Sequence, residues 1–118
     1  MDYDVVIIGG GPSGLATAIK LAQTFKEKNL DKSICVLEKS AEIGGHILSG
    51  NVFETTALDE LIPDWKEKGA PLDVKVKRDA IKFLINDKYS LPVPSFVMPT
   101  MQNHGNYILS LGNLCRWL

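Results

Sequence analysis

The sequence predicts an α/β protein with a parallel sheet, because three features follow one another near its start. Four consecutive β-branched residues, Val5 to Ile8, indicate a buried strand that runs directly into the glycine turn Gly9-x-Gly11-x-x-Gly14. Apolar residues at helical spacing come next. A second apolar run, Ile34–Leu37, indicates another short buried strand. Strand, helix and strand in this order form a βαβ unit, whose strands lie parallel.

The glycine turn has the spacing of a dinucleotide-binding loop. Gly9 lets the backbone turn sharply out of the strand, Gly11 lacks a Cβ that would hold a pyrophosphate away from the main chain, and Gly14 lets helix and strand approach closely. The N–H groups and positive dipole end of the helix attract phosphates. An ordinary strand–turn–helix without a ligand is the alternative. We expect six residues to hold the phosphates: Gly9, Gly10, Gly11, Pro12, Ser13 and Gly14.

The first predicted helix fades at Asn29, and the strand after it closes at Glu38, 24 positions beyond Gly14. A carboxylate at the end of the second strand accepts hydrogen bonds from the ribose hydroxyls of an adenosine. It repels a 2′-phosphate, so NADP is a poor fit here. Without the glycine turn, a solvated strand-end carboxylate would be the simpler interpretation of Glu38.

Composition describes an ordinary globular protein of one domain. The 118 residues are 45% hydrophobic and 23% charged, with a net charge of −1. Basic and acidic residues are interleaved, which argues against nucleic-acid binding. Cys35 and Cys115 lie 80 positions apart without a CxxC pair, so we expect no metal or iron–sulfur site within this chain. Small core residues in a reducing compartment are the better interpretation of both cysteines.

No catalytic side chains can be assembled from the sequence. His46 and His104 are the two histidines, and a hydrogen-bonded structural role is favoured over proton transfer for each. We find no nucleophile–base pair, paired carboxylates or Ser/His/Asp set at usable spacing. Any chemistry is therefore expected from a cofactor that the protein positions.

Beyond Glu38, glycines and prolines divide the chain into short elements. Gly44 and Gly45, in a loop expected from Lys39 to Gly50, permit a second close approach to a bulky ligand, which NAD folds do not need and flavin-binding relatives commonly show. A capping box at Thr56–Asp59 predicts a short helix that stops before Pro63. Asp64–Lys68 predicts one further helical turn with Gly69 at its C-terminal cap and Trp65 in packing.

The second half of the chain predicts mainly strands. Residues 73–91 resemble a strand–turn–strand hairpin, and residues 106–109 indicate another strand. Ser110 is expected to cap a final helix, which breaks off after two turns and suggests a truncated domain. Residues 89–115 carry no charge, and their prolines forbid a spanning helix; a buried loop is favoured over contact with a membrane surface. The early first strand predicts no signal or transit peptide.

Several of these segments together resemble one family. The glycine turn and Val36–Lys39 are shared by many flavoproteins, whereas Ile62-Pro63-Asp64-Trp65-Lys66 and Asn103-His104-Gly105-Asn106-Tyr107 are more distinctive. With Gly44 to Gly50, they resemble the N-terminal part of the electron-transfer flavoprotein–ubiquinone oxidoreductases. The resemblance implies a Rossmann-like FAD-binding domain that is incomplete over residues 1–118 and carries a small β-hairpin insertion.

The resemblance also implies a function and a place in the cell. The family takes electrons from reduced electron-transfer flavoprotein and delivers them to ubiquinone, using FAD and a [4Fe-4S] cluster. By the resemblance, Glu38 and Lys39 lie at the adenosine ribose, and Gly45 and His46 at the flavin, although Ala is commoner than Gly at position 45. The loop from Ile43 onward would face the quinone and the membrane. The cluster ligands and quinone pocket would lie outside this chain, which alone should be inactive.

The resemblance places the protein peripherally on the cytoplasmic side of a bacterial inner membrane, the counterpart of the mitochondrial one. A related FAD-dependent reductase of the geranylgeranyl-reductase kind is an alternative that the Pro63-Asp64-Trp65 segment disfavours. An inactive nucleotide-binding module for NAD or ADP is another, which Gly44-Gly45 and the uncharged stretch disfavour.

Overall fold

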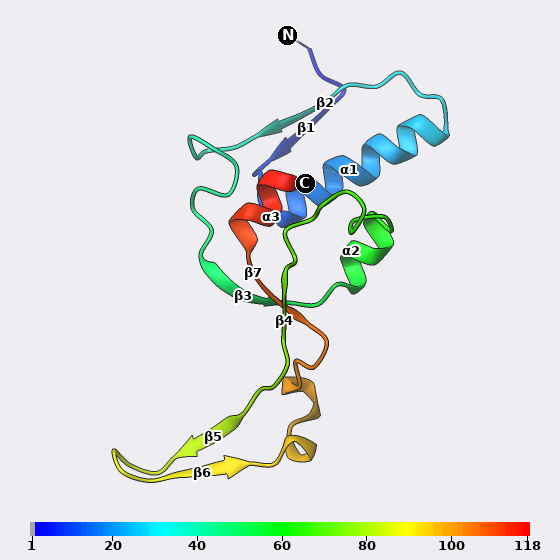
Figure 1. The fold of residues 1–118 in the computed structure, drawn as a ribbon. Helices are drawn as coiled ribbons and strands as arrows, with labels where there is room; N and C mark the ends of the chain where they lie inside the picture. Colours follow the sequence, from blue (N-terminus) through cyan, green and yellow to red (C-terminus); the bar gives the residue numbers. More distant parts are fainter. Residues whose placement is uncertain (1) are drawn as a thin grey trace.

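The computed structural model describes residues 2–118. Its first part is a pair of parallel strands against which helix α1 packs (Figure 1). Strand β1 (Val5–Ile8) runs beside β2 (Ile34–Leu37), and α1 (Pro12–Glu27) connects and packs against both. This is the predicted βαβ unit.

Helix α1 ends at Glu27, just before Asn29, the residue at which the sequence predicted that the helical pattern fades. Asn29 has φ +51°, and Leu30 N–H donates to the Phe25 carbonyl at 2.8 Å while Asn29 N–H donates to Lys26 at 3.2 Å. This pair of bonds is a Schellman cap, which satisfies carbonyls that the end of a helix leaves free. The amide Nε2 of Gln23 also donates to the Leu61 carbonyl at 2.8 Å and ties α1 to the neighbouring helix α2 (Thr56–Leu61).

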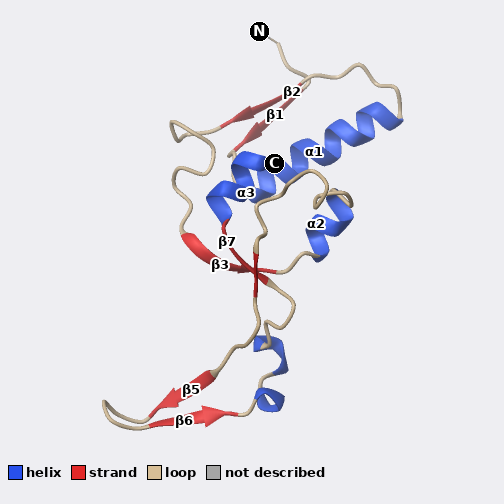
Figure 2. Ribbon diagram, viewed as in Figure 1, coloured by secondary structure: helices blue, strands red, loops and turns tan. Residues whose placement is uncertain are grey.

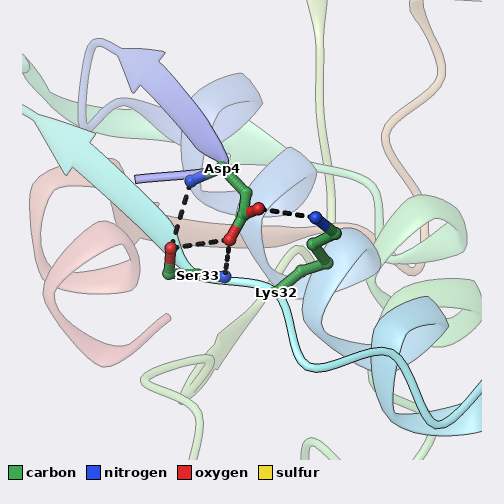
Figure 3. Close-up of polar contacts among 3 residues, drawn as sticks. All are labelled: Asp4, Lys32 and Ser33. Atoms are coloured by element: carbon green, nitrogen blue, oxygen red, sulfur yellow. Dashed lines mark hydrogen bonds and ion pairs between the residues drawn. The ribbon is translucent and has the colours of Figure 1, made fainter. Parts of the chain in front are cut away.

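The amino ends of β1 and β2 are joined by a polar cluster (Figure 3). The carboxylate of Asp4 accepts bonds from Lys32 Nζ at 2.6 Å and from the Ser33 amide and hydroxyl at 2.8 and 2.9 Å. The Ser33 hydroxyl in turn accepts from Asp4 N–H at 3.1 Å. The cluster fixes the register of the two strands at the end opposite the glycine turn.

A second sheet is antiparallel and has the order β3-β7-β4 (Figure 2). Its strands are β3 (Ser49–Phe53), β7 (Tyr107–Ser110) and β4 (Val74–Lys75). Strand β7 confirms the predicted strand, whereas β3 begins inside the segment expected to be loop as far as Gly50. Val74 was expected in the hairpin but pairs with Ile108 of β7. Both differences arise because each partner strand is distant in sequence.

The core lies between this sheet, α2 and α3 (Leu111–Trp117). Trp65 is only 4% exposed and meets the Tyr107 ring edge-on at 6.0 Å, which confirms its predicted packing role. Ser110 caps α3 as predicted, since its side chain accepts from the Asn113 amide. The buried members of the core are Leu58, Trp65, Leu72, Leu109 and Leu114.

Two local predictions around Trp65 met different outcomes. The capping box at Thr56–Asp59 is wrong: Thr55 is the N-cap of α2 and makes no side-chain cap bond, while Asp59 accepts from Trp65 Nε1 at 2.6 Å. Asp64–Lys68 forms the single turn that was predicted, with the Lys68 N–H donating to the Asp64 carbonyl at 3.1 Å, and it closes with a Schellman pair around Gly69, at φ +70°.

The predicted hairpin exists and protrudes as an arm (Figures 1 and 2). It consists of β5 (Ile81–Leu84) and β6 (Ser90–Val93), followed by two 3₁₀ turns, Ser95–Val97 and Pro99–Met101. The arm makes the molecule long, with principal extents of 62 × 29 × 23 Å. The expected buried loop over residues 89–115 is therefore wrong in its first half, where Phe96 is 80% exposed; only its end, from β7 into α3, enters the core. Across the described residues, no helix is long and apolar enough to span a membrane.

Candidate dinucleotide-binding site

The glycine turn leaves β1 directly beside the end of β2. Gly9 has φ +104°, a conformation that favours glycine, and its N–H donates to the Leu37 carbonyl at 2.7 Å. This bond extends the parallel pairing by one residue before the chain turns into α1. The turn therefore lies at the carboxyl edge of the strand pair, where ligands of α/β sheets bind.

Gly14 and Gly11 face different surroundings within this turn. A Cβ on Gly14 would overlap the Gly9 carbonyl oxygen, so helix and strand approach as closely as predicted only because Gly14 has no side chain. A Cβ on Gly11 would meet nothing within 4 Å, and Gly11 has ordinary backbone angles of φ −81° and ψ −178°. The fold itself therefore does not require glycine at position 11, whereas a ligand against the main chain would.

Helix α1 presents uncapped N–H groups at this turn. Gly11 is the N-cap, Pro12 is the first helical residue as predicted, and no side chain caps the helix. The first bond in the ladder runs from Leu15 N–H to the Gly11 carbonyl at 3.0 Å. The amides of Ser13 and Gly14 come before it and have no acceptor within the helix. Together with the helix dipole they can bind a phosphate.

Glu38 lies against the glycine turn and not out in solvent. Its Oε2 accepts from the Gly10 N–H at 2.6 Å, and its Oε1 accepts from the Ser40 N–H at 2.8 Å. The bond from Ser40, followed by that from Gly10, holds the pKa of this carboxyl below its ordinary value. The carboxylate is therefore ionised at neutral pH, and each oxygen keeps a lone pair that can accept from a ribose hydroxyl.

The other predicted site residues follow on the loop after β2. Lys39, Gly45 and His46 are exposed there. A coulombic interaction with His46 also lowers the pKa of Glu38, so the imidazole lies near enough to act on this carboxylate. The structure thus brings the turn Gly9–Gly14 and Glu38 into direct contact, with the loop from Lys39 to His46 running past them.

Three residues around the site have no signal in the sequence. Ile43 places its Cδ1 where a Cβ on Gly10 would stand, and Ser40 supplies an amide to Glu38. Gly112 of α3 touches the loop at Gly44. Their roles depend on contacts between distant segments, which no local pattern records.

The cysteines and histidines form no metal site. Cys115 is 1% exposed, and burial raises the pKa of its thiol; Cys35 is half-buried, and both are free thiols. Within residues 2–118, no three His, Cys, Asp or Glu side chains are grouped so that they could hold a metal ion. His104 is exposed on the loop before β7.

A βαβ unit with a bare glycine at the mouth of its helix and an acid at the next strand end defines a Rossmann-like dinucleotide-binding protein. The model of the NAD(P)-binding Rossmann-like domain family matches residues 7–65, and the chain belongs to this family.

Curated relatives at high identity share a single name. The chain is 56% identical to the electron transfer flavoprotein-ubiquinone oxidoreductase of Pseudomonas aeruginosa, over 100% of this chain and 22% of that protein. It is 51% identical to the mitochondrial protein of that name from Arabidopsis thaliana, over 100% of this chain and 18% of the relative. It is also 56% identical to the mitochondrial protein of that name from Dictyostelium discoideum, over 98% of this chain and 19% of the relative. These relatives confirm the resemblance, and the chain spans about a fifth of their length.

Proposed function

We propose that this chain is the FAD-binding part of an oxidoreductase that passes electrons from reduced electron-transfer flavoprotein to ubiquinone. One observation carries the proposal: the whole chain, glycine turn included, aligns at 56% identity with a relative of that name. The chain corresponds to about a fifth of the relatives, so we further propose that residues 1–118 are the incomplete first part of the domain.

The geometry of the site supports the binding of a dinucleotide such as FAD. In the proposal, the turn from Gly9 to Gly14 holds the pyrophosphate, Glu38 accepts from the adenosine ribose with Lys39 beside it, and Gly45 and His46 lie along the flavin. The bare space at Gly11 and the uncapped amides of α1 support this placement. FAD supplies the electron transfer when bound, while the residues of this chain bind and orient it.

Two other functions remain as alternatives to test. A non-catalytic module for NAD or ADP would use the same glycine turn and ribose acid, and the family model takes its name from NAD(P). An FAD-dependent reductase of the geranylgeranyl-reductase kind would also bind FAD. The names of the relatives favour the ubiquinone oxidoreductase over both alternatives.

The deciding experiment uses the purified full-length protein. We expect a yellow protein with an oxidised-flavin absorption spectrum, which bleaches with reduced electron-transfer flavoprotein and recovers with a soluble ubiquinone analogue. A folded, colourless protein that binds NAD would contradict the flavin assignment. A yellow protein that does not respond to electron-transfer flavoprotein would favour the other reductase.

The [4Fe-4S] cluster of the proposed enzyme cannot be ligated by this chain alone. A cluster of this type takes four cysteine thiolates, and the chain has two cysteines, of which Cys115 is buried in the core. We therefore propose that the cluster ligands lie in the rest of the protein. Iron and sulfide analysis of the full-length protein should find four of each per FAD.

The hairpin arm supports the proposed peripheral place on a membrane, the cytoplasmic side of a bacterial inner membrane by resemblance. Phe83 pairs with Leu91 across the hairpin and shares a face with the Ile81–Val93 pair, so this face is apolar. An isolated two-stranded hairpin is only marginally stable in water, so we expect the apolar face of the arm to lie against another surface, here the membrane. Exposed apolar side chains continue beyond the strands: Ile85, Tyr89, Phe96, Val97 and Met101.

Vesicle flotation tests the membrane contact. Changing Phe83 and Phe96 together to Ser should reduce the bound fraction on phosphatidylcholine–phosphatidylglycerol vesicles by about ten-fold or more, because each side chain contributes roughly 1.5–3 kcal/mol on full burial. Val52→Ser with Ile108→Ser, an exposed cross-strand pair on the body, is the matched control and should leave flotation unchanged. Equal loss in both variants would rule out the arm as the contact. Leu48, 84% exposed on the loop after β2, is the next candidate.

A further inference from the structure

The loop after β2 meets helix α3 backbone to backbone at two glycines. A Cβ on Gly44 would lie 2.6 Å from the Gly112 carbonyl oxygen, and a Cβ on Gly112 would lie 3.0 Å from the Gly44 carbonyl oxygen. Gly44 also has φ +78°, and Gly112 is buried. A side chain at either position would press on the backbone of the other segment, so the separation of the two segments is set by main-chain contact.

The neighbours of Gly44 make contacts on both sides of the loop. On the side of α3, Glu42 Oε1 pairs with Arg116 Nη2 at 3.1 Å, and the same guanidinium donates to Asn113 Oδ1 at 2.8 Å. On the side of the glycine turn, Ile43 lies against Gly10. Three consecutive loop residues thus connect α3 to the candidate site, immediately before Gly45 and His46.

We propose that Gly112 is a positioning residue of the dinucleotide site, because its bare backbone sets how far Gly45 and His46 lie from the glycine turn. The inference rests on the proposed function, in which these two residues border the flavin half of FAD. A methyl group at position 112 pushes Gly44 away by a few tenths of an ångström. Gly45 and His46 must move with their neighbour.

The adenosine half of the ligand is expected to be insensitive to this shift. Its contacts are the glycine turn and Glu38, which are bonded to each other directly. The loop reaches that part through the Ser40 amide, which comes before the displaced residues in sequence, and through the flexible tip of the Ile43 side chain, which can absorb a small displacement. The effect of Gly112 should therefore fall on FAD and spare ADP.

Calorimetric titration of the apo form of the full-length protein with FAD and with ADP tests the proposal. Gly112→Ala should weaken FAD binding about ten-fold, since sub-ångström misplacement of a site is costly, and should change ADP binding less than about two-fold. The thermal midpoint of the apo protein should change little, because the helix preference of Ala over Gly offsets the close contact of the new methyl group with Gly44. Lys26→Ala, at an exposed position near the carboxyl end of α1 and away from the loop, is the control and should leave both affinities unchanged.

Unchanged FAD affinity in Gly112→Ala would overturn the proposal, and so would an equal loss for FAD and ADP, which would indicate a general effect on the domain. If the wild-type protein binds ADP but not FAD, the proposed function fails, and this inference fails with it. If Gly112→Ala does not fold, the ion pair between Glu42 and Arg116 provides a second test of whether the contact between loop and helix positions the site. Arg116→Glu should weaken FAD binding about two-fold, and adding Glu42→Arg should restore it. Absence of that restoration would overturn the proposal.

Discussion

Gly11 and Gly14 stand three residues apart in one turn, yet the fold requires glycine only at position 14. The Gly9 carbonyl leaves no room for a Cβ on Gly14, whereas a Cβ on Gly11 points into open space. Glycine at position 14 is needed for the packing of helix on strand, and the space at position 11 is open to a ligand. The two glycines therefore separate folding from binding experimentally.

Gly11→Val should abolish dinucleotide binding while the apo protein still folds. The valine side chain would occupy the space of the pyrophosphate, and the apo protein should lose only about 1 kcal/mol through the poorer N-cap. Fluorescence titration with FAD and urea unfolding measure the two quantities. Gly14→Ala is the opposite case and should destabilise the apo protein by roughly 1–3 kcal/mol or more, because the added carbon meets backbone. Retained FAD affinity in Gly11→Val would refute the placement of the pyrophosphate.

Glu38→Ala should weaken ADP binding roughly ten-fold or more, because the ribose loses an ionised acceptor. Glu38→Gln should also bind poorly, since one amide nitrogen would face a backbone donor, Gly10 or Ser40. Isothermal titration with ADP measures both variants, and Glu67→Ala, an exposed carboxylate on the Asp64–Gly69 turn, is the control. An ADP affinity equal to that of the wild type in both variants would show that Glu38 only stabilises the turn and does not bind the ribose.

Trp65→Ala should destabilise the protein by about 3–5 kcal/mol, the usual range for removing a large buried aromatic side chain. Trp65→Phe keeps most of the packing and loses the bond to Asp59, so its effect should be smaller. Urea unfolding followed by circular dichroism gives both values. A loss in Trp65→Phe as large as in Trp65→Ala would mean that the indole hydrogen bond, and not the packing, dominates.

The parallel unit and the candidate site could be predicted because their signals are local. The strand β1, the glycine turn and the periodic helix are adjacent in sequence, and Glu38 follows the next apolar run. The turn even fixes its own conformation through Gly9, whose φ is positive. Local propensity and tertiary structure agree here, and in such regions sequence reasoning is reliable.

The rest of the fold depended on contacts between distant residues. Strand β3 pairs with β7 through partners such as Phe53 and Tyr107, 54 positions apart. Asp59 has the spacing of a capping residue but bonds Trp65, because the buried indole needs an acceptor. The same holds at the site, where Gly44 and Gly112 meet although nothing in the sequence pairs the two positions.

Asp4→Asn should lower the stability of the protein at neutral pH and make it less sensitive to acid. The bond from Lys32, then the bonds from Ser33, hold the pKa of Asp4 far below its ordinary value near 4. A carboxyl with a depressed folded-state pKa contributes stability above its unfolded pKa, and this contribution is lost as the pH falls below about 4. The same contacts raise the pKa of Lys32, so its contribution is present below about pH 10 and is lost at higher pH.

Thermal unfolding of wild type and Asp4→Asn at pH 7 and at pH 2.5 measures this contribution. At pH 7 we expect the midpoint of the variant to be lower by roughly 3 °C, because the ion pair is exposed and such pairs contribute little. At pH 2.5 the difference should narrow, since Asp4 takes up a proton in the unfolded chain, whereas the cluster in the folded protein still holds it ionised. Asp87→Asn, at the exposed tip of the hairpin, is the control and should follow wild type at both pH values. A difference that does not depend on pH would show that Asp4 acts by shape and hydrogen bonding instead of by its charge.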